Sequence, residues 1–156
     1  MPYPRVPPNP DDDLAVRIVS EVTAPRSTVF EVIEDLELFS SLETNTTEVE
    51  YETEHRRGLG VKTRWTMRDP ESGETWESHE EIVHYDPPHQ YAYRGAAEGR
   101  DYSGVHTLTE NADGTTRHEF NEVFHFDADP PTYEAAVAEL IANAKREAER
   151  RHRDPG

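Results

Sequence analysis

The sequence predicts an α+β domain in which a curved antiparallel sheet of about seven strands wraps around a long C-terminal helix. Three observations carry this prediction. Two-residue alternation of apolar and polar side chains fills most of residues 14–126, a helical pattern interrupts it after the first strand, and a longer helical pattern follows it. A sheet that curves around a helix encloses space, so we expect an internal ligand cavity.

The chain of 156 residues suits one domain with one core, which we place at residues 14–152. Residues 1–13 contain five prolines and a run of three aspartates. This composition is typical of an extended chain without a core of its own, so we expect a flexible arm there.

The first predicted strand covers residues 14–22, where one face carries Val16, Ile18, Ser20 and Val22. Thr23 can then cap a helix that has Pro25 in its first turn, because proline is tolerated there and fixes φ. The strand therefore leads directly into a helix.

That helix has an apolar stripe at helical spacing, made of Val29, Val32, Ile33 and Leu36. Residues 36–42 predict a second short helix or turn. Six more strands are predicted, at residues 46–54, 61–68, 74–85, 90–95, 102–110 and 115–126. The segments between them contain Gly, Pro, Asn and Asp, which are typical of turns.

The last helix is predicted to begin near Asp129 or Thr132, either of which can cap it. Its apolar stripe is Tyr133, Val137, Leu140, Ala144 and Ala148, with Ile141 beside it. The C-terminal turns are rich in arginine, which favours the negative end of a helix dipole.

The charge of the chain is unusual: it has 33 acidic and 16 basic residues, which gives a net charge of −17. Nucleic acid is therefore not expected as a partner, because no basic face offsets phosphate charge. Two interpretations stay open, an ordinary acidic protein and one adapted to high salt, where counterions screen an acidic surface.

Further classes of function are disfavoured by what the sequence lacks. It has no cysteine, no apolar run near the ~20 residues of a membrane span, and no apolar stretch at its start that resembles a secretory signal. We therefore expect a cytoplasmic protein without an integral membrane segment, a metal or a cofactor.

Three segments resemble the SRPBCC superfamily, which includes START-like, Bet v 1-like and polyketide cyclase/dehydrase proteins. They are residues 22–35 (VTAPRSTVFEVIED), residues 85–91 (YDPPHQY), and Leu108-Thr109-Glu110 followed by Asp113-Gly114-Thr115. The resemblance spans about residues 14–150 and implies a helix-grip fold with an internal cavity. Its members bind lipids, sterols, polyketides or aromatic molecules, only some are enzymes, and they share no universal catalytic residues.

Polar residues on the inner face are the candidates for chemistry. Alternation puts His118, Phe120, Glu122, Phe124 and Phe126 on one face of the last strand, and the phenylalanines make it the core side. A carboxylate there must pair or raise its pKa. Glu122 is thus a candidate ligand anchor or general acid/base, with His118 and His106 as candidate partners. The alternative is a strand end open to water, or a bulge that reverses the alternation.

The facing of the fourth strand is left open, because Ile82 and Val83 favour opposite faces. If Ile82 points inward, a polar cluster could form across the strands from Glu80, His84, His106, His118 and Glu122. Imidazole and carboxylate groups can bind a metal, but no close ligand spacing supports one, so no metal is assigned.

Aromatic and apolar side chains could line the cavity for a flat apolar ligand, although ordinary core packing explains them equally well. The predicted ligand-binding residues are Trp65, Trp76, Tyr91, Tyr93, His106, Leu108, Phe120, Glu122, Phe124, Val137 and Leu140.

Three functions follow as hypotheses. The first is binding of a hydrophobic, lipid- or polyketide-like small molecule. The second is a cyclase or dehydratase that uses an inward acid/base pair such as His118 with Glu122. The third is a protein-interaction module with a protein partner, which would show an exposed apolar patch.

Overall fold

The computed structural model describes residues 14–43, 45–69, 72–97, 100–124 and 130–154. The arm predicted at residues 1–13 lies outside them. The strands are β1 (Leu14–Val22), β2 (Thr46–Tyr51), β3 (Lys62–Arg68), β4 (Thr75–Asp86), β5 (Gln90–Ala97), β6 (Arg100–Glu110) and β7 (Thr116–Phe124). The helices are α1 (Arg26–Glu34), α2 (Leu36–Ser41) and α3 (Pro130–Arg153).

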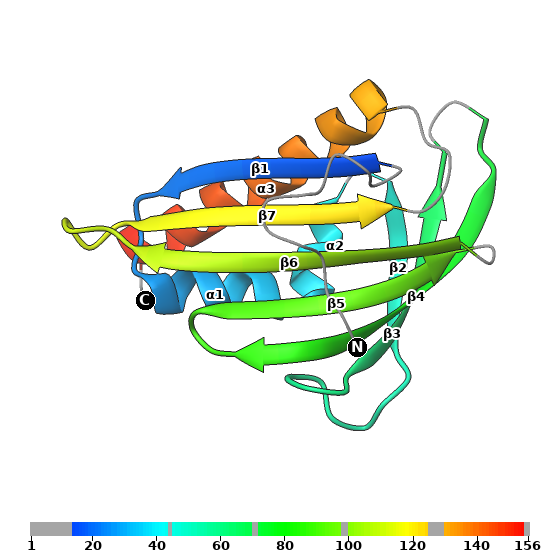
Figure 1. Ribbon diagram of the computed structural model, residues 1–156, viewed down its shortest axis with the longest axis horizontal. Helices are drawn as coiled ribbons and strands as arrows, with labels where there is room; N and C mark the ends of the chain where they lie inside the picture. Colours follow the sequence, from blue (N-terminus) through cyan, green and yellow to red (C-terminus); the bar gives the residue numbers. More distant parts are fainter. Residues whose placement is uncertain (1–13, 44, 70–71, 98–99, 125–129, 155–156) are drawn as a thin grey trace.

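The seven strands form one antiparallel sheet in the order β1-β7-β6-β5-β4-β3-β2. The sheet curves, and all three helices lie on one side of it (Figure 1). Helix α3 packs against β1 and α1, while α2 packs against β2. This arrangement confirms the predicted helix-grip fold.

Helix α1 begins without the side-chain cap that the sequence suggested. Pro25 occupies the N-cap position in an extended conformation, and its carbonyl accepts hydrogen bonds from the backbone N–H groups of Thr28 and Val29. The prediction that Thr23 caps this helix is wrong. Its backbone N–H donates instead to Oε2 of Glu149 on α3, at 2.8 Å, so the turn before α1 is tied to the last helix.

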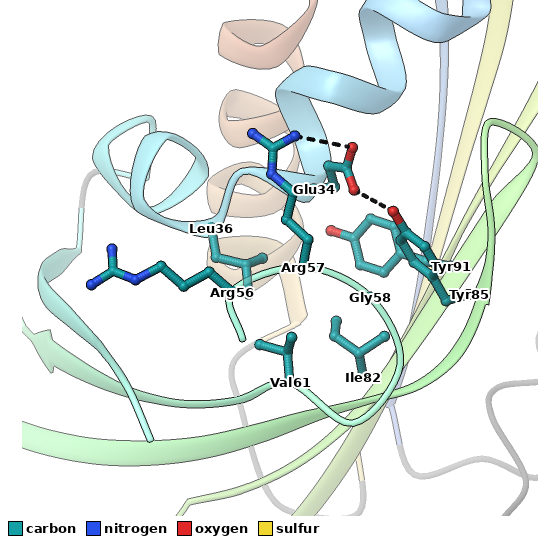
Figure 2. Close-up of a pocket in the computed structure, with 9 residues that line it drawn as sticks. All are labelled: Glu34, Leu36, Arg56, Arg57, Gly58, Val61, Ile82, Tyr85 and Tyr91. Atoms are coloured by element: carbon teal, nitrogen blue, oxygen red, sulfur yellow. Dashed lines mark hydrogen bonds and ion pairs between the residues drawn. The ribbon is translucent and has the colours of Figure 1, made fainter. Parts of the chain in front are cut away.

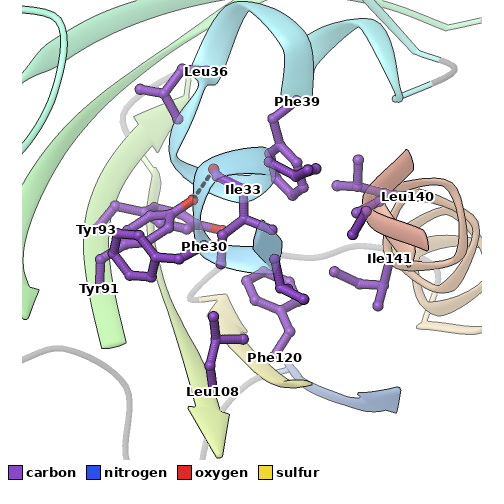
Figure 3. Packing of buried hydrophobic residues seen from close by; sticks show 14 of the residues in the cluster. Phe30, Ile33, Leu36, Phe39, Tyr91, Tyr93, Leu108, Phe120, Leu140 and Ile141 are labelled. Carbon is purple, nitrogen blue, oxygen red and sulfur yellow. Dashed lines mark hydrogen bonds between the residues drawn. The ribbon is translucent and has the colours of Figure 1, made fainter. Parts of the chain in front are cut away.

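Helix α3 begins at Pro130, so Thr132 lies inside the helix and the prediction that it forms the cap is wrong. Asp129 and the side chain of Tyr133 lie outside the described part. The rest of the predicted stripe is buried: Val137, Leu140, Ile141, Ala144 and Ala148. Figure 3 shows Leu140 and Ile141 on α3 facing Phe39 and Phe120 across the core. No described helix is both long and apolar enough to cross a membrane.

A bulge in β4 settles the facing that the sequence left open. The pairing of β4 with β5 runs from Ile82 opposite Tyr93 to Tyr85 opposite Tyr91, with a register shift between Ile82 and His84. One extra residue on β4 reverses the alternation. Ile82 and Tyr85 therefore both point inward, whereas His84 leaves the inner face.

Replacing Leu140 tests the packing of α3 against the sheet. We expect Leu140→Ala to lower the free energy of unfolding by about 2–5 kcal/mol, because it removes a side chain that is 8% exposed and leaves a cavity. Urea denaturation measures this loss. The matched control is Glu134→Ala on the exposed side of α3, expected within about 0.5 kcal/mol of wild type. Equal effects of the two substitutions would contradict the assigned stripe.

Candidate functional site

The inner face of the sheet brings two tyrosine–glutamate pairs together from four neighbouring strands. The hydroxyl of Tyr93 on β5 donates a hydrogen bond to Oε2 of Glu122 on β7. The hydroxyl of Tyr102 on β6 donates to Oε2 of Glu80 on β4, at 2.6 Å. The two side chains thus cross the β5–β6 boundary in opposite directions, with ring centroids 6.2 Å apart and planes at 74°.

Two glycines make this crossing possible. Gly104 lies opposite Tyr93 and Gly95 lies opposite Tyr102 in the β5–β6 register. A Cβ atom on Gly104 would lie 2.5 Å from the Tyr93 ring, and one on Gly95 would lie 2.4 Å from the Tyr102 ring. The hydroxyl end of each phenol therefore passes close to a glycine, which is a recognised use of glycine inside a strand.

The carboxyl groups lie in an environment that disfavours their charge. Burial raises the pKa of Glu80 to about 8, the hydrogen bond from Tyr102 opposes this rise, and the charges of Glu122 and Glu43 add to it. Burial also raises the pKa of Glu43. Burial, together with the neighbouring carboxylates, raises the pKa of both tyrosines well above the usual 10, so they remain hydrogen-bond donors at neutral pH. Glu80 is protonated at neutral pH and can donate as well as accept.

The two inward histidines bind each other instead of Glu122. Nδ1 of His106 and Nε2 of His118 are 2.9 Å apart, and the rings stack. Burial lowers the pKa of His118 to about 4, and burial together with His118 lowers that of His106 well below 6.5. Both imidazoles are therefore neutral at pH 7. Nε2 of His106 is buried and has no hydrogen-bond partner among the described residues.

Glu122 is buried on the inner face as expected, with 5% exposure. It accepts a hydrogen bond from the phenol of Tyr93, whereas the sequence analysis named His118 and His106 as its candidate partners. Ile82 points inward, but the polar cluster predicted for that case does not form. His84 turns away from the inner face at the bulge, and His106 and His118 bind each other. The described residues contain no group of three or more His, Asp or Glu side chains that could hold a metal ion.

The other predicted ligand-binding residues occupy two kinds of position. Leu108, Phe120, Tyr91, Trp65, Val137 and Leu140 are buried in the core. The Tyr91 hydroxyl donates to the carbonyl of Ile33 at 2.7 Å (Figure 3), and Nε1 of Trp65 donates to Oγ1 of Thr63 at 2.8 Å. Trp76 is half-buried at the start of β4. The side chain of Phe124 lies outside the described part, as does all of Phe126.

The inner face is unevenly filled. Near β1, β6 and β7 most of its side chains are buried against the helices, although Ile18 and Ser20 on β1 are half-buried. Towards β2, β3 and β4, more of the inward side chains are only half-buried: Val49, Tyr51, Met67, Trp76, Glu80 and Tyr85.

A small pocket opens where α1 and α2 meet the segment between β2 and β3 (Figure 2). Its lining residues are Glu34, Leu36, Arg56, Arg57, Gly58, Val61, Ile82, Tyr85 and Tyr91. Glu34 joins two elements, because Tyr85 donates to it at 2.7 Å and Arg57 approaches it at 3.9 Å. The enclosed part of the pocket has room for about one water molecule.

Sequence reasoning missed Tyr102, Glu43 and the pocket-lining residues other than Tyr91. Glu80 entered only through the metal hypothesis. One signal was present: Gly95 and Gly104 each interrupt a strand interior, and such glycines often mark a close approach of another group. A second signal was Gly58. It lies in the turn that borders the pocket, and its φ is +94°.

Residues 14–152 match the family model described as polyketide cyclase/dehydrase and lipid transport. No curated protein matches the chain. The fold is similar to that of a conserved protein from Geobacillus kaustophilus, with a TM-score of 0.75 and 14% identity over 89% of this chain and 97% of that one. It is also similar to the Zhui aromatase/cyclase from Streptomyces sp. R1128, with a TM-score of 0.69 and 23% identity over 91% and 97% of the two chains.

A third similar structure is the ginseng major latex-like protein 151 from Panax ginseng, with a TM-score of 0.67 and 10% identity over 86% of this chain and 96% of that one. These likenesses show a shared fold. Together with the family match they confirm the resemblance to the SRPBCC superfamily that the sequence motifs carry.

Gly104→Ala tests the seating of the Tyr93 ring. We expect the added Cβ to displace the ring from Glu122 and to lower the free energy of unfolding by about 1–3 kcal/mol, measured by urea denaturation. In a Tyr93→Ala background the same substitution should cost almost nothing, because the obstructing ring is gone. An equal loss in both backgrounds would show that Gly104 matters for another reason.

The histidine pair predicts a loss of stability in acid. The folded-state pKa of His118, about 4, lies below the unfolded value of about 6.5, so the unfolded chain binds the proton more readily. The stabilisation is present above pH 6.5 and is lost as pH falls towards 4, by on the order of 3 kcal/mol for one such group. Urea denaturation from pH 7.5 to 4 measures it. His118→Gln should flatten this part of the curve, and an unchanged curve would contradict the assignment.

Proposed function

Because the chain belongs to the polyketide cyclase/dehydrase and lipid transport family, we propose that it binds an apolar or aromatic small molecule between the sheet and the helices. The observation that carries this proposal is the uneven filling of the inner face. Apolar side chains at the β2–β4 end, including Met67 and Trp76, keep accessible surface although they point towards the helices. Apolar walls with a few polar groups are typical of small-molecule sites.

The polar groups near these half-buried side chains would orient the ligand. They are the Tyr102–Glu80 pair and, next to it across β5 and β6, the Tyr93–Glu122 pair. Because these groups share one face of a hydrogen-bonded sheet, they are held in place before a ligand arrives. Such preorganisation lowers the entropic cost of binding.

A fluorescent apolar probe tests this function. We expect N-phenyl-1-naphthylamine to bind with a rise in fluorescence, and Ala97→Phe to weaken binding by about tenfold or more, because Ala97 is half-buried on the inner face of β5 opposite Ser78. The matched control is Ala96→Phe, since Ala96 is exposed on the opposite face of the same strand. Absence of saturable binding, or equal effects of the two substitutions, would contradict the proposal.

A second candidate function is the cyclase or dehydratase chemistry that the family description includes. One arrangement favours it: the Glu80 carboxyl lies beside the Tyr102 hydroxyl at 2.6 Å on the inner face, where burial raises the pKa of Glu80 to about 8 and suits it to act as a general acid. The imidazoles are poor substitutes, since they are neutral and bound to each other. Native mass spectrometry of the freshly purified protein distinguishes the two functions. A small molecule retained through purification favours binding, whereas an enzyme would have released its product.

The third hypothesis, a protein-interaction module, has less support. In the described part of the chain the large apolar side chains with high exposure are Val19, at 42%, and Leu59, at 64%. Val19 lies on β1 and Leu59 lies between β2 and β3, at opposite edges of the sheet. They do not form one patch.

A further inference from the structure

The outer face of the sheet, opposite the helices, contains a row of buried side chains. Ala92 on β5, Val105 on β6 and Asn121 on β7 lie opposite one another in the strand pairing, and Arg17 on β1 continues the row. Ala92, Val105 and Asn121 are each 0% exposed. An antiparallel sheet that packs one face on a core commonly leaves the other face to water. The burial of this row therefore requires a cover.

The described helices and strands do not supply this cover. All three helices lie on the other side of the sheet (Figure 1), and Val105 lies midway along β6, away from the turns at its ends. Side chains stand roughly perpendicular to a sheet, so the tip of a valine stays open to water unless a taller neighbour or a second layer lies over it. The nearest outward neighbours of Val105 are short: Ser103, Thr107, Ala92 and Asn121. Its burial therefore indicates a second layer over the row.

Asn121 shows independently that water is excluded here. Its Nδ2 donates to Oε2 of Glu119 at 3.0 Å, whereas its Oδ1 is buried and has no hydrogen-bond partner in the described part of the chain. An amide oxygen on a solvent-facing surface would bind water, so this atom is shielded. The shielding is local, because Val19 on β1, also on the outer face, is 42% exposed.

The cover comes from the chain itself, because the burial is that of a single chain. Residues 1–13 form the longest segment outside the described part, and they lead directly into β1, the strand beside β7. The other such segments are residues 44, 70–71, 98–99, 125–129 and 155–156. They are shorter, and residues 125–129 lead to α3 on the opposite side of the sheet. Residues 1–13 are therefore the segment that can supply the layer.

We infer that residues 2–10 lie across the outer face of the sheet and cover Ala92, Val105 and Asn121. The inference goes beyond the proposed function, which concerns the inner face. It makes the N-terminal arm a second layer behind β5, β6 and β7, the strands that carry Tyr93, Tyr102 and Glu122 on their other side.

The arm is long enough to reach the row. Its 13 residues span about 40 Å in the polyproline conformation, at about 3.1 Å per residue. The row begins at Arg17, about 10 Å along β1 from Leu14, and crosses from β1 to β5 in steps of about 4.8 Å, which is about 25 Å in all.

The composition of the arm favours the face of the sheet over its edge. β1 is an edge strand, but a segment with five prolines cannot pair along it, because proline has no N–H to donate. A proline-rich chain is stiff and extended, so it loses little conformational entropy when it docks on an apolar surface. The prolines, together with Tyr3 and Val6, offer apolar contacts to Ala92 and Val105.

Alkylation of single thiols tests this inference in the full chain. The protein has no cysteine, so Val105→Cys and Ala92→Cys each place one thiol in the buried row. Iodoacetamide is neutral, so the net charge of −17 does not repel it, and mass spectrometry follows the reaction. Each variant is compared with the same variant whose residues 2–10 are replaced by glycine and serine at unchanged length. We expect this glycine–serine arm to raise the alkylation rate of both thiols by about tenfold or more, because the cover is lost.

The matched control is Val19→Cys, which places a thiol at an exposed position of the same face. Its alkylation rate should change by less than about twofold with the glycine–serine arm, because no cover lies over it. Val105→Cys and Ala92→Cys lie on different strands, so if one of them fails to fold the other still decides the question.

Four outcomes would overturn the inference. With the native arm, thiols in the row that react as fast as the control thiol would show that the row is open in solution. Equal protection with both arms would assign the cover to another segment. A faster reaction at Val19→Cys as well would mean that the sheet has loosened as a whole. Protection that weakens on dilution of the native protein would assign the cover to a second copy of the chain.

Discussion

The pairing register of β5 with β6 is the constraint on which the rest of the interior depends. It sets Tyr93 opposite Gly104 and Tyr102 opposite Gly95, so that each phenol can cross one strand and reach a carboxyl group beyond it. A slip of either strand by one residue would turn the ring of that strand to the outer face. The same register therefore positions the tyrosine–glutamate pairs on the inner face.

Burial of acidic groups in a chain with a net charge of −17 carries a cost in stability. The outer face limits that cost with ion pairs such as that of Arg17 with Glu119, and on the inner face Glu80 and Glu122 accept hydrogen bonds from the phenols of Tyr102 and Tyr93. Groups held in an unfavourable environment by their surroundings are typical of functional sites. Together with the half-buried inward side chains near β2, β3 and β4, these groups are the main physical support for a ligand on the inner face.

The β4 bulge connects this acidic interior with the pocket at α1. Because alternation reverses between Ile82 and Tyr85, one strand supplies Glu80 to the tyrosine pairs and Tyr85 to the pocket. Tyr85 then binds Glu34 at the end of α1, which Arg57 also approaches. A strand without the bulge would turn one of these two groups to solvent, so the irregularity serves both regions.

The sequence by itself determined the order of the elements, the apolar stripe of α3 and the inward facing of Phe120 and Glu122, because alternation and helical spacing are local properties of the chain. The tertiary structure alone decided the partners. Glu122 binds Tyr93, and His118 binds His106, because cross-strand neighbours depend on register, on a bulge that no local pattern marks, and on how loops align strands far apart in sequence. The sequence therefore indicated which side chains could carry chemistry, whereas the partner of each one could be assigned only from the assembled sheet.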